Sequence, residues 1–107
     1  MTINEYQQQA ARFCNPEINS DNMLLMAVMG LCGEAGEVID HVKKQRFHGH
    51  PLDRDALIRE LGDVAWYLAH AALALDTSLE EVLEQNLQKL QARYPDGFSA
   101  ERSLRRS

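Results

Sequence analysis

The sequence predicts an all-α fold, a bundle of about four helices that is completed by homo-oligomerisation. Across the 107 residues, apolar side chains recur at the three- and four-residue spacing that is typical of amphipathic helices. The three prolines, Pro16, Pro51 and Pro95, all fall between helical stretches. One of these stretches is apolar on nearly every side, and a chain of this length cannot surround such a helix alone.

The first helix is expected from a capping pair, Thr2 and Glu5, and it ends before Pro16. Its inward face consists of Ile3, Tyr6, Ala10 and Phe13. The polar cluster at residues 19–22 starts a second helix over about residues 22–45. The core stripe of this helix is Leu24, Val28, Leu31, Ala35, Val38 and Val42. A separate face carries Gly30, Glu34, Glu37, His41 and Lys44.

The segment His48-Gly49-His50-Pro51 breaks the chain, and Asp53 caps a third helix over about residues 53–75. One stripe of this helix is aliphatic: Leu57, Leu61, Val64, Leu68 and Leu75. A second stripe is polar: Glu60, Asp63, Tyr67 and His70. The remaining face is apolar again: Gly62, Trp66, Ala69 and Leu73. This helix therefore has no solvent side, which favours a homo-oligomer, most simply a two-fold dimer.

Ser78 and Glu81 cap a fourth helix, which ends at Pro95-Asp96-Gly97. Its apolar side chains are expected to face inward: Leu79, Val82, Leu83, Leu87 and Leu90. Its polar edge carries Asn86, Lys89 and Arg93. We therefore expect one domain over residues 1–98. Residues 99–107 form a basic tail without a periodic apolar set, which we expect to be mobile.

Composition excludes several classes of protein. The net charge of −5 disfavours binding of a nucleic acid polymer. The N-terminus has neither the basic start nor the apolar stretch of a signal peptide. No run approaches the roughly 18 uninterrupted apolar residues of a membrane helix, so we expect a cytoplasmic protein without a membrane partner. Two cysteines are too few for a disulfide scaffold, and Cys14 and Cys32 are expected to be buried free thiols.

Two acidic pairs, Glu34/Glu37 and Glu60/Asp63, carry the strongest functional signal. Members of each pair are three residues apart and share a helix face. Both pairs lie roughly ten residues from the break at residues 48–51, about 15 Å along each helix. An antiparallel hairpin would therefore place the four carboxylates at the same distance from the turn, on neighbouring helices. Their mutual repulsion, about 1 kcal/mol per pair in water and several times more when partly buried, requires cations or protons nearby.

The usual interpretation of an acidic pair on a helix is a solvated face. Here both pairs are surrounded by apolar residues, over residues 31–39 and 61–66. Four helical glycines also cost about 1 kcal/mol each relative to alanine, which suggests close approach of a backbone or ligand. They are Gly30, Gly33, Gly36 and Gly62.

An all-oxygen ligand set suits Mg²⁺, with Mn²⁺ as the second possibility. Di-iron bundles are the nearest alternative, but they use Glu-x-x-His motifs. In this chain the partners three residues beyond Glu37 and Glu60 are Asp40 and Asp63. His41 lies one position further on, where it either contacts metal or phosphate or closes the helix end.

Because Mg²⁺ usually meets substrate phosphates, nearby cationic and polar side chains are candidate substrate-binding residues. They are Lys44, Tyr67, Asn86, Lys89 and Arg93. Each one alone is also explained as an ordinary solvated side chain.

Three motifs resemble the MazG-like nucleotide pyrophosphohydrolases, within the all-α nucleoside triphosphate pyrophosphatase superfamily. The motifs lie at residues 33–38 (GEAGEV), 60–68 (ELGDVAWYL) and 86–98 (NLQKLQARYPDGF). The resemblance implies a dimer or tetramer in which Glu34, Glu37, Glu60 and Asp63 hold Mg²⁺. It also implies hydrolysis of a nucleoside triphosphate between the α- and β-phosphates, giving a nucleoside monophosphate and pyrophosphate. Asn86, Lys89 and Arg93 then match positions near the phosphates and sugar, and Glu37 is preferred as the residue that aligns the water.

Two other functions stay open at this point. One is a non-catalytic nucleotide-binding or oligomerisation module of the same fold. The other is a metal-dependent phosphohydrolase acting on a different linkage, such as that of a nucleotide-sugar. For the leading hypothesis, removal of noncanonical or excess nucleotides is a plausible role, while the base and sugar preference are left open.

Overall fold

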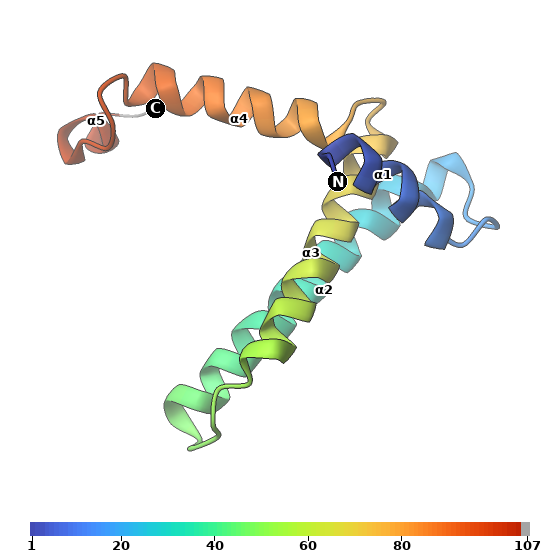
Figure 1. The fold of residues 1–107 in the computed structure, drawn as a ribbon, viewed down its shortest axis with the longest axis horizontal. Helices are drawn as coiled ribbons and strands as arrows, with labels where there is room; N and C mark the ends of the chain where they lie inside the picture. Colours follow the sequence, from blue (N-terminus) through green and yellow to red (C-terminus); the bar gives the residue numbers. More distant parts are fainter. Residues whose placement is uncertain (106–107) are drawn as a thin grey trace.

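The computed structural model describes residues 1–105, and over that range the chain is all-α, with no β-strand. Figure 1 shows the order of its elements. They are α1 (Ile3–Ala10), the 3₁₀ helix η1 (Ala11–Phe13), α2 (Ser20–Phe47), α3 (Arg54–Ala74), α4 (Leu79–Arg93) and α5 (Ala100–Leu104). The all-α part of the predicted fold class is confirmed, and the completion of a bundle by homo-oligomerisation stays a prediction. Helix α5 was not predicted, and the last two residues of the expected tail lie outside the described range.

The helix starts follow the sequence closely. Four side chains each accept a hydrogen bond from the backbone N–H three residues further on, over 3.0 to 3.1 Å: Thr2, Asn19, Asp53 and Ser78. Such caps satisfy backbone donors that have no partner inside the helix, and each contributes about 1 kcal/mol. Helix α2 is longer than predicted at both ends, and its turn into α3 uses Gly49 at a φ of 71°.

Helices α2 and α3 form the predicted antiparallel hairpin and lie side by side along their length (Figure 1). At one point between these helices the ring of Tyr67 lies directly against Gly30. A Cβ atom at Gly30 would come within 2.1 Å of that ring. The close approach expected at the helical glycines therefore occurs at Gly30. At Gly33, Gly36 and Gly62 an added Cβ would meet no atom of the described chain within 4 Å.

Helices α1 and η1 cross the open end of the hairpin, where the small core lies (Figure 1). The indole Nε1 of Trp66 donates a hydrogen bond to the carbonyl of Ala10 over 3.1 Å. His70, which periodicity places on the acidic stripe, is instead buried and stacked on Trp66 with ring centroids 3.8 Å apart. The buried apolar residues are Ala10, Ala27, Ala69, Ala72 and Leu79.

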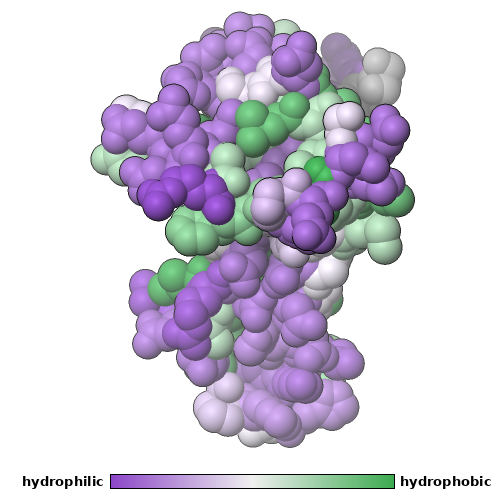
Figure 2. All heavy atoms as spheres, turned by 90° about the vertical axis from the view of Figure 1, so that its right-hand side faces the viewer, coloured by the Kyte–Doolittle hydropathy of each residue, from purple (hydrophilic) through white to green (hydrophobic). Residues whose placement is uncertain are grey.

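Helix α4 extends away from the hairpin instead of packing along it (Figure 1). The radius of gyration is accordingly 16.9 Å, against about 13 Å for a compact chain of this length. The prediction that the apolar side chains of α4 face inward is wrong within one chain, because only Leu79 is buried. The exposed ones are Val82, Leu83, Leu87 and Leu90. Figure 2 shows apolar patches reaching the surface above the stem of the hairpin.

Two further expectations are tested by the fold. Both cysteines are free, as expected, but Cys14 is only half-buried and Cys32 is exposed, so the prediction of buried thiols is wrong for the single chain. Helix α2 is long and apolar enough, by length and composition only, to cross a membrane, and 6% of its most apolar window is buried. The same helix packs along α3 and carries Glu34 and Glu37.

Candidate metal centre

Three acidic side chains from the two helices of the hairpin converge on one point. Glu34 from α2 and Glu60 and Asp63 from α3 each place a carboxylate oxygen within 4.8 Å of the other two. Glu60 and Asp63 share a face because they are three residues apart on α3. The turn at residues 48–53 brings Glu34 level with them, as the symmetry of the sequence about this turn predicts. Glu34 and Glu60 are half-buried, and Asp63 is exposed.

Glu37, the fourth predicted ligand, is exposed and lies outside this group of three. Its position one turn beyond Glu34 places it further along α2. Its charge still acts on the cluster, because it contributes to the raised pKa of Glu34. The structure therefore separates the four predicted acids into a converging set of three and one residue beside it.

The negative charge of the cluster raises the pKa of two side chains, Glu34 and Tyr6. The pKa of Glu34 is raised, first by a hydrogen bond with Glu60, then by partial burial and the negative charges of Glu60, Asp63 and Glu37. The pKa of Tyr6 is raised by burial and by the charge of Asp63. Carboxylates held this close favour a shared proton or a bound cation. A set of three carboxylates fits a hard divalent ion such as Mg²⁺ or Mn²⁺, which prefers oxygen ligands.

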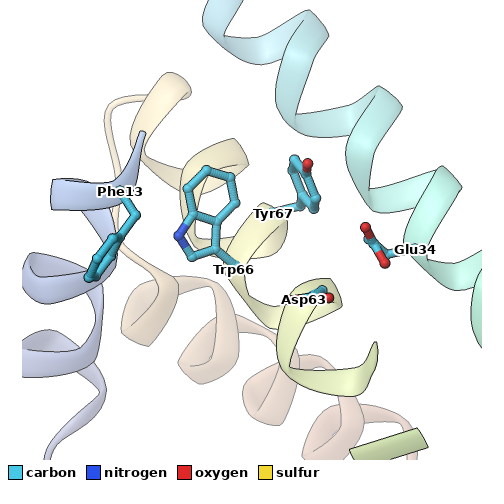
Figure 3. A pocket seen from close by; sticks show the side chains of 5 residues that line it. All are labelled: Phe13, Glu34, Asp63, Trp66 and Tyr67. Atoms are coloured by element: carbon cyan, nitrogen blue, oxygen red, sulfur yellow. The ribbon is translucent and has the colours of Figure 1, made fainter. Parts of the chain in front are cut away.

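A pocket of about 440 Å³ opens beside the acids. It is lined by Phe13, Glu34, Asp63, Trp66 and Tyr67, and Figure 3 shows how they lie. Glu34 points from α2 toward α3, Phe13 lies on the opposite side of the pocket, and the rings of Trp66 and Tyr67 lie between them, with Tyr67 nearer to α2 (Figure 3). The rings of Trp66 and Tyr67 meet edge to face at 5.0 Å. One pocket thus combines an anionic end with an aromatic wall.

Of the pocket residues, Phe13 and Trp66 are not identified by sequence reasoning as site residues. Periodicity places both on inward apolar faces, which holds for the half-buried Trp66 but is wrong for Phe13, because Phe13 is 75% exposed in the single chain. Their convergence depends on the packing of α1, which leads directly into η1, against α3, with Trp66 bound to Ala10 by its indole hydrogen bond. The aromatic pair Trp66-Tyr67, three and four residues after Asp63 and so about one helical turn away, was the available signal.

The predicted cationic residues do not line this pocket. Lys44 forms an ion pair with Asp40 over 2.9 Å, which raises the pKa of Lys44 and lowers that of Asp40. His41 Nε2 lies 4.0 Å from an oxygen of Glu60, so this histidine is at the edge of the cluster.

The remaining three candidates, Asn86, Lys89 and Arg93, lie on α4, away from the hairpin (Figure 1). Arg93 stacks over its neighbour Tyr94, with the guanidinium carbon 5.9 Å from the ring centre. Within one chain, this polar edge and the acids are therefore separate.

Comparison with known proteins gives a family match and a similar protein. The profile of the family described as MazG nucleotide pyrophosphohydrolase domain matches residues 24–98, which include the three acids and all of α4. The "Gene 37 protein" of Mycobacterium phage L5 is 45% identical over 78 residues, which span 69% of this chain and 68% of that protein. No solved structure gives a significant match. The matched segment contains the paired acidic motifs and the hairpin that brings them together, and the chain belongs to the MazG nucleotide pyrophosphohydrolase domain family.

Proposed function

We propose that this protein is a Mg²⁺-dependent nucleoside triphosphate pyrophosphohydrolase, with Mn²⁺ as an alternative metal. In the proposed reaction, water attacks the α-phosphorus and the bond from that phosphorus to the bridging oxygen breaks. The products are a nucleoside monophosphate and pyrophosphate, and the proton lost by the water goes to a carboxylate. The observation that carries the proposal is the convergence of Glu34, Glu60 and Asp63 beside an aromatic-walled pocket.

Each part of the pocket has a role in this proposal. Glu34, Glu60 and Asp63 would hold the divalent ion, which when bound lowers the pKa of a coordinated water and offsets charge on the phosphates. Glu37, one turn from Glu34 and outside the cluster, accepts the proton of the attacking water. The Tyr67 hydroxyl is a hydrogen-bond donor for phosphate or sugar. The rings of Phe13 and Trp66 offer an apolar surface for the base or ribose.

The surface area supports a homo-oligomer, a dimer or tetramer, as part of the proposal. The chain exposes 8211 Å², whereas a compact monomer of 12.1 kDa exposes about 6,000 Å². The excess of about 2,200 Å² per chain, doubled for a pair, falls in the range of roughly 2,000–5,000 Å² of obligate homodimers. Packing of α2 against α3 and against a second chain would then explain why this long helix is so apolar. This explanation is consistent with a cytoplasmic protein.

The test is pyrophosphate release from a panel of ribo- and deoxyribonucleoside triphosphates in the presence of Mg²⁺. We expect release from the wild type and a loss of at least about a hundredfold in Asp63→Ala and Glu37→Ala, the range typical for loss of a metal-site or proton-transfer group. Glu17→Gln is the matched control, because this acid is exposed in the loop before α2. Equal activity in all variants would rule the mechanism out.

The same assay separates the alternatives. Calorimetry with Mg²⁺ and a nonhydrolysable triphosphate detects binding independently of turnover. Binding without release of pyrophosphate from any substrate would identify a non-catalytic nucleotide-binding module. Products other than monophosphate and pyrophosphate would identify a phosphohydrolase that acts on a different linkage.

A further inference from the structure

A second pocket, of about 450 Å³, lies at the open end of the hairpin, where the end of η1, the first turn of α2 and the end of α3 come together (Figure 1). It shares no lining residue with the acid pocket. Three of its lining side chains carry atoms that bind soft metals: Cys14, Met23 and His70. The other lining residues are apolar apart from one hydroxyl: Ala11, Ser20, Leu73 and Ala74. No described carboxylate lines this pocket, so it does not offer the ligands that Mg²⁺ prefers.

The imidazole of His70 is oriented as a metal ligand would be. Its Nδ1 lies 2.8 Å from the carbonyl oxygen of Trp66. Because a carbonyl can only accept, Nδ1 of the neutral ring carries the proton and donates this bond, which leaves a lone pair on Nε2. His70 is 2% exposed, and its Nε2 has no hydrogen-bond partner among the described residues. A histidine that binds metal through one ring nitrogen commonly donates the other N–H to a backbone carbonyl in this way.

The two sulfur atoms of the pocket are spaced as ligands of one ion. Sγ of Cys14 lies 3.9 Å from Sδ of Met23. Two sulfur ligands at about 2.3 Å from one ion, the length of a Zn–S bond, lie about 3.8 Å apart at a tetrahedral angle and about 4.0 Å apart at a trigonal angle. Among the described residues the thiol has one other contact, the carbonyl of Asn15, which is also 3.9 Å away. Both sulfur-containing side chains are half-buried, so an ion can reach them from solvent.

We propose that Cys14, Met23 and His70 form a second metal site, which binds the soft monovalent ion Cu(I). Thiolate and thioether ligands select Cu(I), whereas the carboxylates of the acid cluster select hard divalent ions. On binding, the copper keeps its oxidation state, the sulfur of Cys14 forms a bond to it, and the thiol proton passes to solvent. Met23 and His70 bind through lone pairs and lose no proton. This site is independent of the proposed function, because the two pockets have no residue in common.

Competition with a coloured Cu(I) chelator, without oxygen and with ascorbate as the reductant, tests the site in the purified protein. Saturating Mg²⁺ is present throughout, so that the acid cluster does not compete. We expect the wild type to take one equivalent of Cu(I) per chain from the chelator. Cys14→Ser should lower the affinity at least about a hundredfold, because loss of a group that only supports a ligand already costs about 10–100-fold. Met23→Leu, which conserves volume, should lower it about tenfold, since a thioether is the weaker ligand.

The matched controls lie on the same helix as Met23. Cys32→Ser removes the other, exposed thiol, and Met26→Leu removes a half-buried thioether that does not line the pocket. Both variants are expected to keep the wild-type affinity. The proposal is overturned if Cys14→Ser binds Cu(I) as tightly as the wild type. It is also overturned if Cys32→Ser loses the ion, because the copper would then be held by an exposed thiol outside the pocket.

Nitrogen NMR of the histidine rings tests the third ligand without removing a buried side chain. The chain has four histidines, and a variant with His41→Asn, His48→Asn and His50→Asn leaves only the signals of His70. In this variant we expect one equivalent of Cu(I) to shift the Nε2 resonance and to leave the proton on Nδ1. An unchanged Nε2 resonance when copper is bound would show that His70 is not a ligand and would overturn the proposal.

Discussion

Replacement of Gly30 by alanine tests the packing of the hairpin where the Tyr67 ring lies against α2. A Cβ atom at this position would lie 2.1, 2.3 and 2.4 Å from three atoms of the Tyr67 ring. Carbon atoms in contact are normally about 3.5–4.0 Å apart, so the two groups cannot keep their positions. The ring has little room to turn, because its neighbour Trp66 meets it edge to face and is itself held by the hydrogen bond to Ala10.

The magnitude follows from two opposing effects. Overpacking of a core contact costs about 1–3 kcal/mol, and the distances here place the clash at the upper end. Alanine in a helix gains about 1 kcal/mol over glycine. Gly33→Ala has the same gain in the same helix and meets no atom within 4 Å, so it is the matched control. The difference in free energy of unfolding between the two variants isolates the clash, about 3 kcal/mol.

Urea unfolding followed by circular dichroism, at one protein concentration for all variants, measures this difference. We expect Gly30→Ala to unfold at the lower urea concentration and Gly33→Ala at or above the wild type. Adding Tyr67→Leu to Gly30→Ala should recover part of the loss, since the smaller side chain makes room. The reasoning is refuted if Gly30→Ala is as stable as Gly33→Ala.

Two further expectations concern the acids. Saturation with Mg²⁺, at about a hundred times its Kd, should raise the free energy of unfolding of the wild type by about 2.7 kcal/mol, and Glu34→Gln should reduce this gain in the same urea titration. In the absence of metal, the raised pKa of Glu34 means that the folded chain binds more protons than the unfolded chain above the ordinary value of 4.5. Its stability in EDTA should therefore fall as pH rises through the raised pKa, and Glu34→Gln should flatten that part of the profile; a profile that rises instead would contradict the clustering.

Local chemistry made much of the fold predictable. Thr2, Asn19, Asp53 and Ser78 determine where helices begin, since each side chain bonds to a backbone group only three residues away. The acidic cluster was predictable for a related reason. A hairpin turn near residue 50 brings together residues that lie at similar distances before and after it. The convergence of Glu34 with Glu60 and Asp63 can therefore be predicted from helix geometry and the position of one turn.

Contacts between elements that are distant in the sequence were not predictable in this way. Phe13 and Trp66 line the same pocket because α1, which leads into η1, packs against α3. The spacing of these two residues in the sequence does not indicate that packing. Similarly, periodicity correctly identifies the apolar stripe of α4 but cannot say whether its partner is in the same chain. The inward assignment of Leu83 and Leu90 failed for this reason, since both are exposed in the single chain.

The small core and the acidic cluster have a common physical consequence. A chain with only five buried apolar residues among those described gains limited stability from its own interior, and its converging carboxylates reduce that stability further. A ligand or partner that binds only the folded form stabilises it by mass action. A divalent cation at the acids would act in this way, and so would a second chain that covers the exposed apolar surface. Folding should therefore be thermodynamically linked to metal binding and to assembly, so that removal of the metal lowers the stability of the folded chain.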